Sequence, residues 1–289
     1  MDETGRIAGL TELVEREIGS PWQGFLAEPR GGGRSGVLVL SGSSGRIERE
    51  RCRVLAAQGV TALSIRWFGG PGQAPGICEI PLETFTAAID LLRERGLRRI
   101  SALGLSKGAE AVLLLATLDQ RLDAVIAISP TSVAWANVGA GLDGVTRPYR
   151  SSWTWRGAPV PYVGYDEGWQ PAEPEGEPVA FRGLYERSRA GYAEAAIPVE
   201  AAGAELLLVA GGDDQMWPSL TFAGELARRR EARIVSGADA GHRPRLPGES
   251  PASPSSAYAY GGTPEADAAL GAAAWPHLVE LVTGRTGRR

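Results

Sequence analysis

The chain has 289 residues, of which 43% are hydrophobic and 22% charged, a composition typical of a globular protein with one large core. Its formal net charge of −4 and the lack of a basic run with interleaved aromatic residues exclude an ordinary nucleic-acid-binding surface. No stretch reaches the roughly 18 uninterrupted apolar residues of a membrane helix, so we expect no membrane partner.

Short apolar runs alternate with amphipathic runs along most of the chain. This alternation predicts an α/β protein in which helices cover both faces of a mostly parallel sheet. Within the last amphipathic run, Pro276 predicts either a kink or the true start of a helix. In chain order we expect strands at 22–29 and 36–42, a helix at 47–58, a strand at 60–65, a helix at 81–96, a strand at 98–106, a helix at 107–118, strands at 124–130, 205–214 and 232–241, and a final helix at 266–282.

The alternation fails at about 131–198, where Pro, Gly, Trp and Tyr are frequent and no period is visible. A loop of this length inside a compact domain is usually either disordered or functional. Its many aromatic residues argue against disorder. We therefore predict a single domain over residues 1–289, with a lid inserted at about 131–198 that covers the strand ends.

The cysteines and the N-terminus indicate where the protein works. Cys52 and Cys78 have neither the spacing of a disulfide framework nor that of a metal site, which predicts reduced thiols and no bound metal. The first residues, MDETGRIAGLTELVEREIG, are acidic and polar, unlike a signal peptide. We therefore expect a cytoplasmic protein. Arginine stands at every basic position except Lys107, which is typical of GC-rich bacterial genomes.

Ser106 lies between Gly104 and Gly108, where a predicted strand meets a predicted helix. A sharp strand–turn–helix of this kind lifts a serine hydroxyl above the sheet, and small residues on either side let the strand and the helix approach closely. The N-terminus of the helix also offers N–H groups to a developing oxyanion. We therefore interpret Ser106 as a nucleophile. The alternative is a helix cap whose glycines serve packing.

A serine nucleophile needs a base, and the chain has two histidines. His277 lies in an apolar, helix-like segment, whereas His242 lies in a loop after the last predicted strand and can reach the carboxyl edge of the sheet. The acid that orients the base is expected between serine and histidine in the chain, and Asp213 and Asp214 both follow a strand there. We favour Asp214, because a proline four residues on suits a turn that presents a carboxylate. Asp213 is then a turn former.

An oxyanion hole needs a second N–H group besides that of Lys107. The segment LVLSGSSGR (38–46) follows a core strand, which makes the N–H of Ser43, or of Ser44, the candidate. The competing interpretation of GSSG is a phosphate-binding turn. Because the segment lacks both the further glycines of a dinucleotide fingerprint and the lysine of a P-loop, we expect no cofactor.

Several other side chains could contact a substrate. The side chain of Lys107 could meet an anionic group or be exposed to solvent. The arginines between residues 46 and 53 are mixed with glutamates, which indicates a solvated helix face rather than a phosphate site. Five tryptophans that follow strands or lie in the expected lid could line an acyl pocket or pack in the core: Trp67, Trp135, Trp153, Trp155 and Trp217.

Between about Gly36 and Leu281, seven segments together carry a family resemblance: RWFGG (66–70), IPLETFTAAIDLL (80–92), GLSKGAE (104–110), IPVE (197–200), GGDDQMWPS (211–219), AGHRP (240–244) and YGGTPEADAALGAAAWPHLVEL (260–281). With them the chain resembles the catalytic domain of the acyl-CoA thioesterase / bile acid-CoA:amino acid N-acyltransferase family, within the α/β-hydrolases.

The resemblance implies an α/β-hydrolase fold with Ser106 as nucleophile, Asp214 as acid and His242 as base. Animal members of the family carry an N-terminal β-sandwich domain, but only some 35 residues precede the first core strand here, so we expect that domain to be absent. The family uses cysteine in its amino-acid transferases and serine in its hydrolases. Since an acyl-serine ester is a poor donor to amines, Ser106 favours water as the acceptor.

The leading hypothesis is therefore a serine thioesterase that acts on acyl-CoA or on carrier-bound acyl groups, with no metal or cofactor and an open oligomeric state. The first alternative is an acyltransferase that passes the acyl group to an amine or alcohol. A carboxylesterase or peptidase with the same triad is a further alternative. A hydrolase-fold binding protein without turnover is the last, although such proteins usually lack part of the triad.

Overall fold

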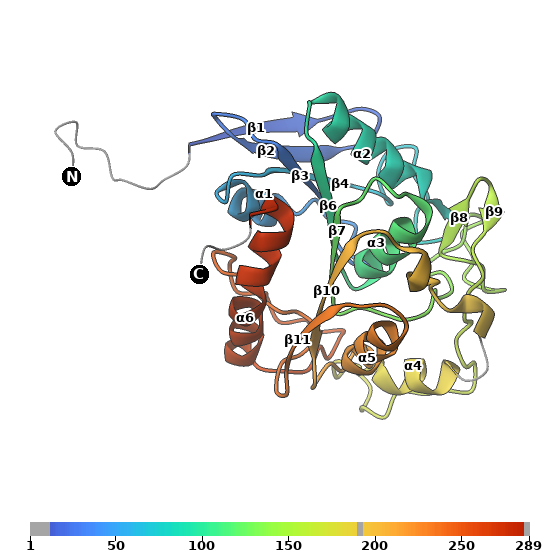
Figure 1. Ribbon diagram of the computed structural model, residues 1–289. Coiled ribbons are helices and arrows are strands. Elements are labelled where there is room, and N and C mark those ends of the chain that lie inside the picture. Colours follow the sequence, from blue (N-terminus) through green and yellow to red (C-terminus); the bar gives the residue numbers. More distant parts are fainter. Residues whose placement is uncertain (1–11, 190–192, 286–289) are drawn as a thin grey trace.

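An eight-stranded sheet forms the centre of the computed structural model, which describes residues 12–189 and 193–285 (Figure 1). The first two strands in spatial order run antiparallel to their neighbours, and the remaining six are parallel to one another. In spatial order the strands are β1 (Leu13–Ile18), β2 (Gly24–Pro29), β4 (Thr61–Ile65), β3 (Ser35–Leu40), β6 (Arg99–Leu105), β7 (Ala124–Ile128), β10 (Glu205–Gly211) and β11 (Arg233–Gly237).

Helices cover both faces of this sheet. On one face α2 (Glu83–Glu94), α3 (Lys107–Leu118) and α5 (Ser219–Arg229) pack on the strands, and α1 (Arg49–Ala56) and α6 (Pro264–Thr283) pack on the other (Figure 1). Because both faces are covered, the central strands read as continuous apolar runs, such as VLVL in β3 and AVIAI in β7. This arrangement confirms the predicted α/β-hydrolase fold.

The elements expected from the sequence occur where continuous apolar or amphipathic runs predicted them. The helix expected at 107–118 has those bounds in the structure, and the final helix contains Pro276 in its interior. The proposal that Pro276 marks the true start of that helix is wrong, since Thr263 caps the helix by accepting a hydrogen bond from the N–H of Ala266. β1 and α5 were not expected.

The segment 131–198 contains structure of its own. Two of its strands, β8 (Trp153–Trp155) and β9 (Ala158–Pro159), form a small second sheet with β5 (Ile80–Pro81), which precedes the segment in the chain. It also holds α4 (Arg182–Ser188) and the 3-10 turn η1 (Ala193–Ala195); η2 (Val199–Ala201) follows it. Isolated bridges tie the segment to itself and to neighbouring loops, including one between Val179 and Tyr258.

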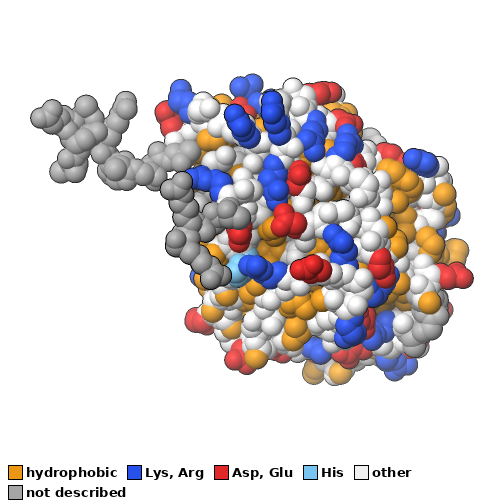
Figure 2. All heavy atoms as spheres, in the orientation of Figure 1, with side chains coloured by type: hydrophobic (Ala, Val, Ile, Leu, Met, Phe, Trp, Pro, Cys, Tyr) orange, Lys and Arg blue, Asp and Glu red, His pale blue; other side chains and the backbone are white. Residues whose placement is uncertain are grey.

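Residues 1–11 lie outside the described residues, so the expectation that the chain begins without a signal peptide stays a prediction. Among the described helices, none is both long and apolar enough to cross a lipid bilayer. Figure 2 shows acidic and basic side chains interspersed over the visible face, with hydrophobic side chains between them.

The parallel strands bring distant parts of the chain to one edge of the sheet. The loops that follow β3, β6, β7, β10 and β11 all leave from the carboxyl ends of neighbouring strands. In an open parallel sheet this edge is where ligands bind. The residues singled out by the sequence, at 43, 106, 214 and 242, lie in these loops.

Candidate active site

Ser106 forms the turn between β6 and α3, with a backbone φ of 57° and ψ of −120°. A positive φ in a residue with a side chain costs about 1–3 kcal/mol and is typical of functional turns. A Cβ atom on Gly104 would lie 2.1 Å from the carbonyl oxygen of Gly108, and one on Gly108 would lie 2.4 Å from that of Ser41. The close approach expected of the two glycines is therefore confirmed. Ser106 occupies the N-cap position of α3, but its side chain forms no capping hydrogen bond with the helix.

Ser106 and His242 line the same cavity, which has a volume of about 330 Å³. The turn after β3 contributes three further residues, and the 131–198 segment contributes three more. The rest of the wall is mostly apolar or aromatic, with two arginines. Besides Ser106 and His242, the lining residues are Gly42, Ser43, Ser44, Arg46, Leu105, Val138, Phe181, Tyr185, Met216, Arg243, Tyr258 and Tyr260.

Asp214 is the carboxylate that meets His242. Its Oδ2 and Oδ1 lie 2.8 and 2.9 Å from His242 Nδ1, and both side chains are buried. Asp214 Oδ1 also accepts hydrogen bonds from the N–H groups of Met216 and Trp217. Asp213 faces elsewhere: its carboxylate accepts hydrogen bonds from the side chain of Gln215 and from the N–H of Gly262. Of the two candidate acids, Asp214 therefore has the geometry to orient the imidazole.

The imidazole of His242 is held on two sides by aromatic rings. Trp217 meets it edge-on, with ring centroids 5.6 Å apart, and Tyr260 stacks on it at 6.1 Å with an interplanar angle of 14°. The backbone is fixed as well, because His242 N donates to the carbonyl of Tyr260 and the hydroxyl of Ser129 donates to the carbonyl of His242. Ser129 follows β7 and has a φ of 49°. No motif in the sequence indicated these two backbone contacts.

The two segments that are expected to supply the oxyanion N–H groups border the nucleophile. Lys107 is the first residue of α3, so its N–H has no acceptor within the helix. Ser43 lies in a turn that is closed by a hydrogen bond from Gly45 N to the carbonyl of Gly42. That turn borders Ser106, since a Cβ atom on Gly42 would lie 3.1 Å from the Cβ of Ser106. The two candidate oxyanion donors thus come from the elements expected of them.

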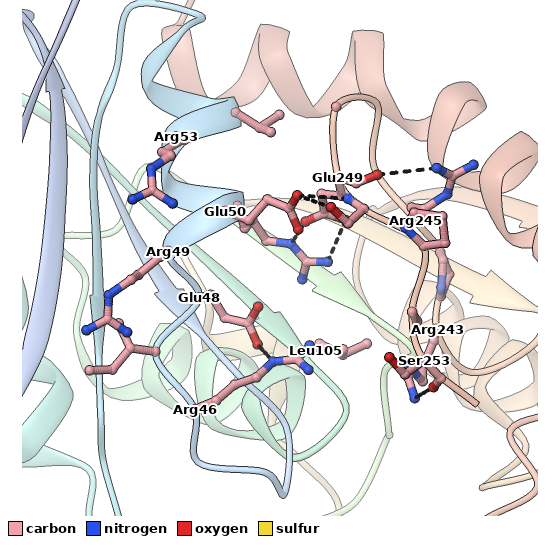
Figure 3. A pocket seen from close by; sticks show the side chains of 18 of the residues that line it. Arg46, Glu48, Arg49, Glu50, Arg53, Leu105, Arg243, Arg245, Glu249 and Ser253 are labelled. Carbon is pink, nitrogen blue, oxygen red and sulfur yellow. Dashed lines mark hydrogen bonds and ion pairs between the residues drawn. The ribbon is translucent and has the colours of Figure 1, made fainter. Parts of the chain in front are cut away.

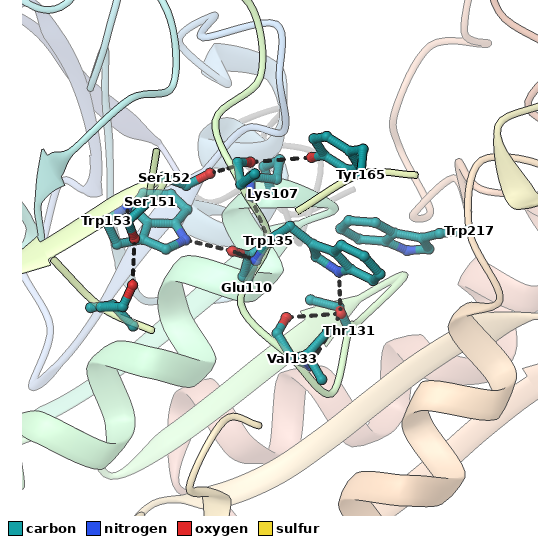
Figure 4. A network of polar contacts seen from close by, with 12 residues as sticks. Lys107, Glu110, Thr131, Val133, Trp135, Ser151, Ser152, Trp153, Tyr165 and Trp217 are labelled. Carbon is teal, nitrogen blue, oxygen red and sulfur yellow. Dashed lines mark hydrogen bonds and ion pairs between the residues drawn. The ribbon is translucent and has the colours of Figure 1, made fainter. Parts of the chain in front are cut away.

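The side chain of Lys107 is neither exposed nor in the cavity, which corrects both interpretations of it (Figure 4). It is 1% exposed, and its Nζ donates to Glu110 Oε2 at 2.8 Å. Burial lowers the pKa of Lys107, while the Glu110 carboxylate opposes that shift. Glu110 Oε1 in turn accepts hydrogen bonds from the backbone N–H of Trp135 and from Nε1 of Trp153. Glu110 therefore joins the turn at Ser106 to the 131–198 segment.

The five candidate tryptophans lie outside the residues described as lining the cavity. Trp67 and Trp153 pack against each other at 5.4 Å in the core, and Trp135 donates from Nε1 to Thr131. Trp155 is partly buried and lies beneath the guanidinium of Arg156. Trp217 reaches the site indirectly, through its contact with His242. Their predicted role in an acyl pocket gains no support, and phenylalanine, tyrosine and methionine side chains line the cavity instead.

Of the arginines after β3, Arg51 alone among the four between residues 46 and 53 departs from the solvated helix face that the sequence indicated. Arg49 and Arg53 are partly exposed and pair with Glu17 and Glu15 of β1. Arg51 is 5% exposed and forms an ion pair with Glu249, which lies nearly 200 positions away in the chain. The sequence pattern could not reveal this pair because no periodicity joins the two residues.

Comparison with known proteins supplies the family context. The family model "BAAT / Acyl-CoA thioester hydrolase C terminal" matches residues 80–287. Human acyl-coenzyme A thioesterase 1 is 24% identical over 265 residues, which cover 86% of this chain and 60% of that protein. Human mitochondrial acyl-coenzyme A thioesterase 2 is equally identical, over 86% of this chain and 52% of its own length. The chain thus spans between half and two thirds of the length of these relatives.

Solved structures share the fold at lower identity. A putative dienelactone hydrolase from Klebsiella pneumoniae superimposes with a TM-score of 0.58 at 14% identity, over 95% of this chain and all of that chain. A puromycin-hydrolysing peptidase from Mycobacterium tuberculosis gives a TM-score of 0.55 at 15% identity, over 99% of this chain and 42% of its own. These likenesses establish the fold alone.

Proposed function

Because the chain belongs to the family of BAAT / acyl-CoA thioester hydrolase C-terminal domains, which it matches over residues 80–287, we propose that it is a serine-dependent acyl thioesterase. The observation that carries the proposal is the arrangement around one cavity. Ser106, in a strained turn, and His242, which is paired with the buried Asp214, both line that cavity. The two candidate oxyanion N–H groups belong to segments that border Ser106.

In the first half of the proposed reaction, Ser106 Oγ attacks the thioester carbonyl and His242 Nε2 takes the hydroxyl proton. Asp214 accepts from Nδ1–H, which keeps the imidazole in the tautomer that can act as base and stabilises the imidazolium. The N–H groups of Lys107 and Ser43 bind the oxyanion, and loss of one such donor typically costs about 3 kcal/mol of transition-state stabilisation. The C–S bond then breaks, and the imidazolium returns a proton to the leaving thiolate.

In the second half, His242 takes a proton from water, the hydroxide attacks the acyl-serine carbonyl, and the carboxylic acid leaves as Ser106 regains its proton. A serine nucleophile supports hydrolysis over transfer, because an oxygen ester is a weaker acyl donor to amines than a thioester. The wall of apolar and aromatic side chains supports an acyl group as the occupant of the cavity. The 131–198 segment, which supplies Val138, Phe181 and Tyr185, is the proposed lid.

The test is thiol release from a panel of acyl-CoA substrates of increasing chain length, measured for the wild type and for Ser106→Ala. We expect release that is lost in the variant. A cavity of about 330 Å³ is at the lower end of the range that holds small ligands, so turnover is expected to be highest with short and medium acyl chains. Equal release by the variant, or none by the wild type with any chain length, contradicts the proposal.

Repeating the assay with amines and alcohols present distinguishes acyl transfer from hydrolysis. Hydrolysis leaves the yield of free acid unchanged when an acceptor is added. An acyl-amide or acyl-ester product formed at the expense of the acid instead assigns the enzyme to transfer. An esterase or peptidase is recognised by oxygen-ester or amide turnover that exceeds thioester turnover.

A further inference from the structure

A second and larger cavity, of about 1020 Å³, adjoins the cavity at Ser106. The two share Arg46, Leu105 and Arg243 in their walls. Its lining comes from α1 with the residues before it, and from the loop after His242, up to Ser256. Figure 3 shows these two groups of side chains facing each other, with Arg46, Arg49 and Arg53 on one side. Arg243 and Arg245 lie on the other side (Figure 3).

This cavity, which we call the arginine cavity, is rich in positive charge. Six arginines and three glutamates line it. Arg46, Arg49, Arg51 and Arg53 each pair with a glutamate. Arg243 and Arg245 form no ion pair with any carboxylate of the described chain. Arg243 and Arg245 donate to the backbone carbonyls of Ser253 and Glu249, respectively. The guanidinium of Arg243 also lies over the ring of Tyr260 and interacts with the Asp267 carboxylate, so of the two it is Arg245 whose charge has no carboxylate or aromatic partner among the described residues.

A buried donor strengthens the case for an anion. Arg51 lies in the same wall, and its Nε and Nη2 donate to Glu249. Its Nη1 is buried and has no acceptor among the described residues. Buried donors on charged groups are normally satisfied by protein, water or ligand, and one left without a partner points to an occupant that is not protein. Ser253, Ser255 and Ser256 bring further hydroxyl groups to the cavity.

Arginine is the side chain best suited to phosphate, because its planar guanidinium donates two parallel hydrogen bonds to two oxygens. The position of the arginine cavity beside the cavity at Ser106 would bring a bound phosphate group close to the proposed thioester cleavage. Arg243 follows the proposed base His242 directly in the chain, and both line the cavity at Ser106. A thioester whose carbonyl lies at Ser106 can therefore extend its thiol side into the arginine cavity.

We propose that the arginine cavity binds the phosphate-bearing nucleotide end of a coenzyme A thioester, with Arg243 and Arg245 contacting phosphate oxygens. The inference rests on the proposed thioesterase function and names the carrier that it uses. Several separate cationic groups and a volume of about 1020 Å³ suit a nucleotide with several phosphates better than the single phosphodiester of a protein-bound pantetheine arm.

The kinetic test compares hexanoyl-CoA with hexanoyl-pantetheine, which has the same thioester and no phosphate. Arg245→Gln is the variant of choice, since Arg245 lines the arginine cavity and not the cavity at Ser106. We expect the KM for hexanoyl-CoA to rise about tenfold, the loss of one charge-assisted hydrogen bond, while kcat/KM for hexanoyl-pantetheine changes less than about twofold. Arg228→Gln removes the same charge from an exposed position on α5, on the other face of the sheet, and should alter neither.

A loss of equal size on both substrates, or an unchanged KM for hexanoyl-CoA, overturns the proposal. If neither thioester is cleaved, the proposed function fails and the site is judged by calorimetry of coenzyme A binding to the wild type and to Arg245→Gln. A dissociation constant about tenfold weaker in the variant supports the site, whereas equal affinity or no binding overturns it. Binding of 4′-phosphopantetheine as tight as that of coenzyme A also overturns the nucleotide assignment.

Discussion

The backbone and the side chain of Lys107 have separate roles. Its backbone N–H is a proposed oxyanion donor, while its side chain enters the interior and pairs with Glu110. A buried ion pair adds little stability over apolar side chains of the same size, but removal of one partner leaves an uncompensated charge. Glu110 also accepts hydrogen bonds from the backbone N–H of Trp135 and from the indole N–H of Trp153. The ion pair of Lys107 and Glu110 therefore links the turn at Ser106 to the 131–198 segment.

Glu110→Gln keeps an acceptor for the two tryptophan donors and removes the charge that Lys107 needs. We expect the free energy of unfolding to fall by roughly 3–5 kcal/mol, measured by denaturant titration. Lys107→Met in the same background removes the stranded charge and should restore part of the loss. A Glu110→Gln protein as stable as the wild type would show that Lys107 is not charged in the folded state.

The two neighbouring aspartates offer a matched pair of variants. Asp214→Asn removes the carboxylate that fixes the His242 tautomer and should lower kcat roughly 10⁴-fold, with KM little changed. Asp213→Asn alters a side chain that contacts Gln215 and Gly262 and should change kcat only a few-fold. Steady-state thiol release measures both. The reverse order of the two losses would transfer the role of acid to Asp213.

The strand–turn–helix unit of β6, Ser106 and α3 depends on the contact between its two backbones. In Gly104→Ala the new Cβ meets the Gly108 backbone, which cannot rotate away, so we expect a loss of about 3 kcal/mol or more in unfolding free energy. Gly31→Ala is the control, because its Cβ would meet nothing within 4 Å. Thermal unfolding of both proteins measures the difference. Similar melting temperatures would mean that the unit relaxes without cost.

At the scale of elements, the sequence predicted the strands that are continuous apolar runs, but it missed the amphipathic helix α5, the edge strand β1 and the shortest strands. β3, β6, β7 and β10 are buried on both faces, so their apolar runs were visible. β1 was missed because its sequence LVEREI exposes most of its charged side chains at the edge of the sheet. The strands β5, β8 and β9 have two or three residues each, too few to show a period.

At the candidate site, the sequence predicted the residues that follow strands but not the contacts that depend on tertiary packing. Ser106, Asp214 and His242 could be picked out because each follows a strand, and the carboxyl ends of parallel strands meet at one edge. The burial of Lys107 and the pairing of Arg51 with Glu249 could not be predicted from the sequence, because each depends on a partner that only the folded chain brings near. The Ser129 hydroxyl that holds His242 is hidden for the same reason.

At the scale of the whole molecule, both cysteines report on the integrity of the core. Cys52 and Cys78 are fully buried, and burial raises the pKa of each thiol above its ordinary value. Since the thiolate is the reactive form, a raised pKa leaves the thiols protonated and unreactive at pH 8. We expect a disulfide reagent such as DTNB to react slowly with the native protein and with both thiols at once in guanidinium chloride. Rapid reaction of the native protein would indicate local opening.

The C-terminal helix α6 has a consequence for how the protein is made. It packs on the face of the sheet that carries Val37, Leu103 and Ile126, and the Ser35 hydroxyl donates to the carbonyl of Thr283. A ribosome releases residues 264–283 after every strand of that sheet, so a nascent chain that has already paired its strands still presents an uncovered apolar surface. That surface stays exposed to solvent until α6 has been synthesised and packs on it, so the position of a single helix sets when the core of the sheet is completed.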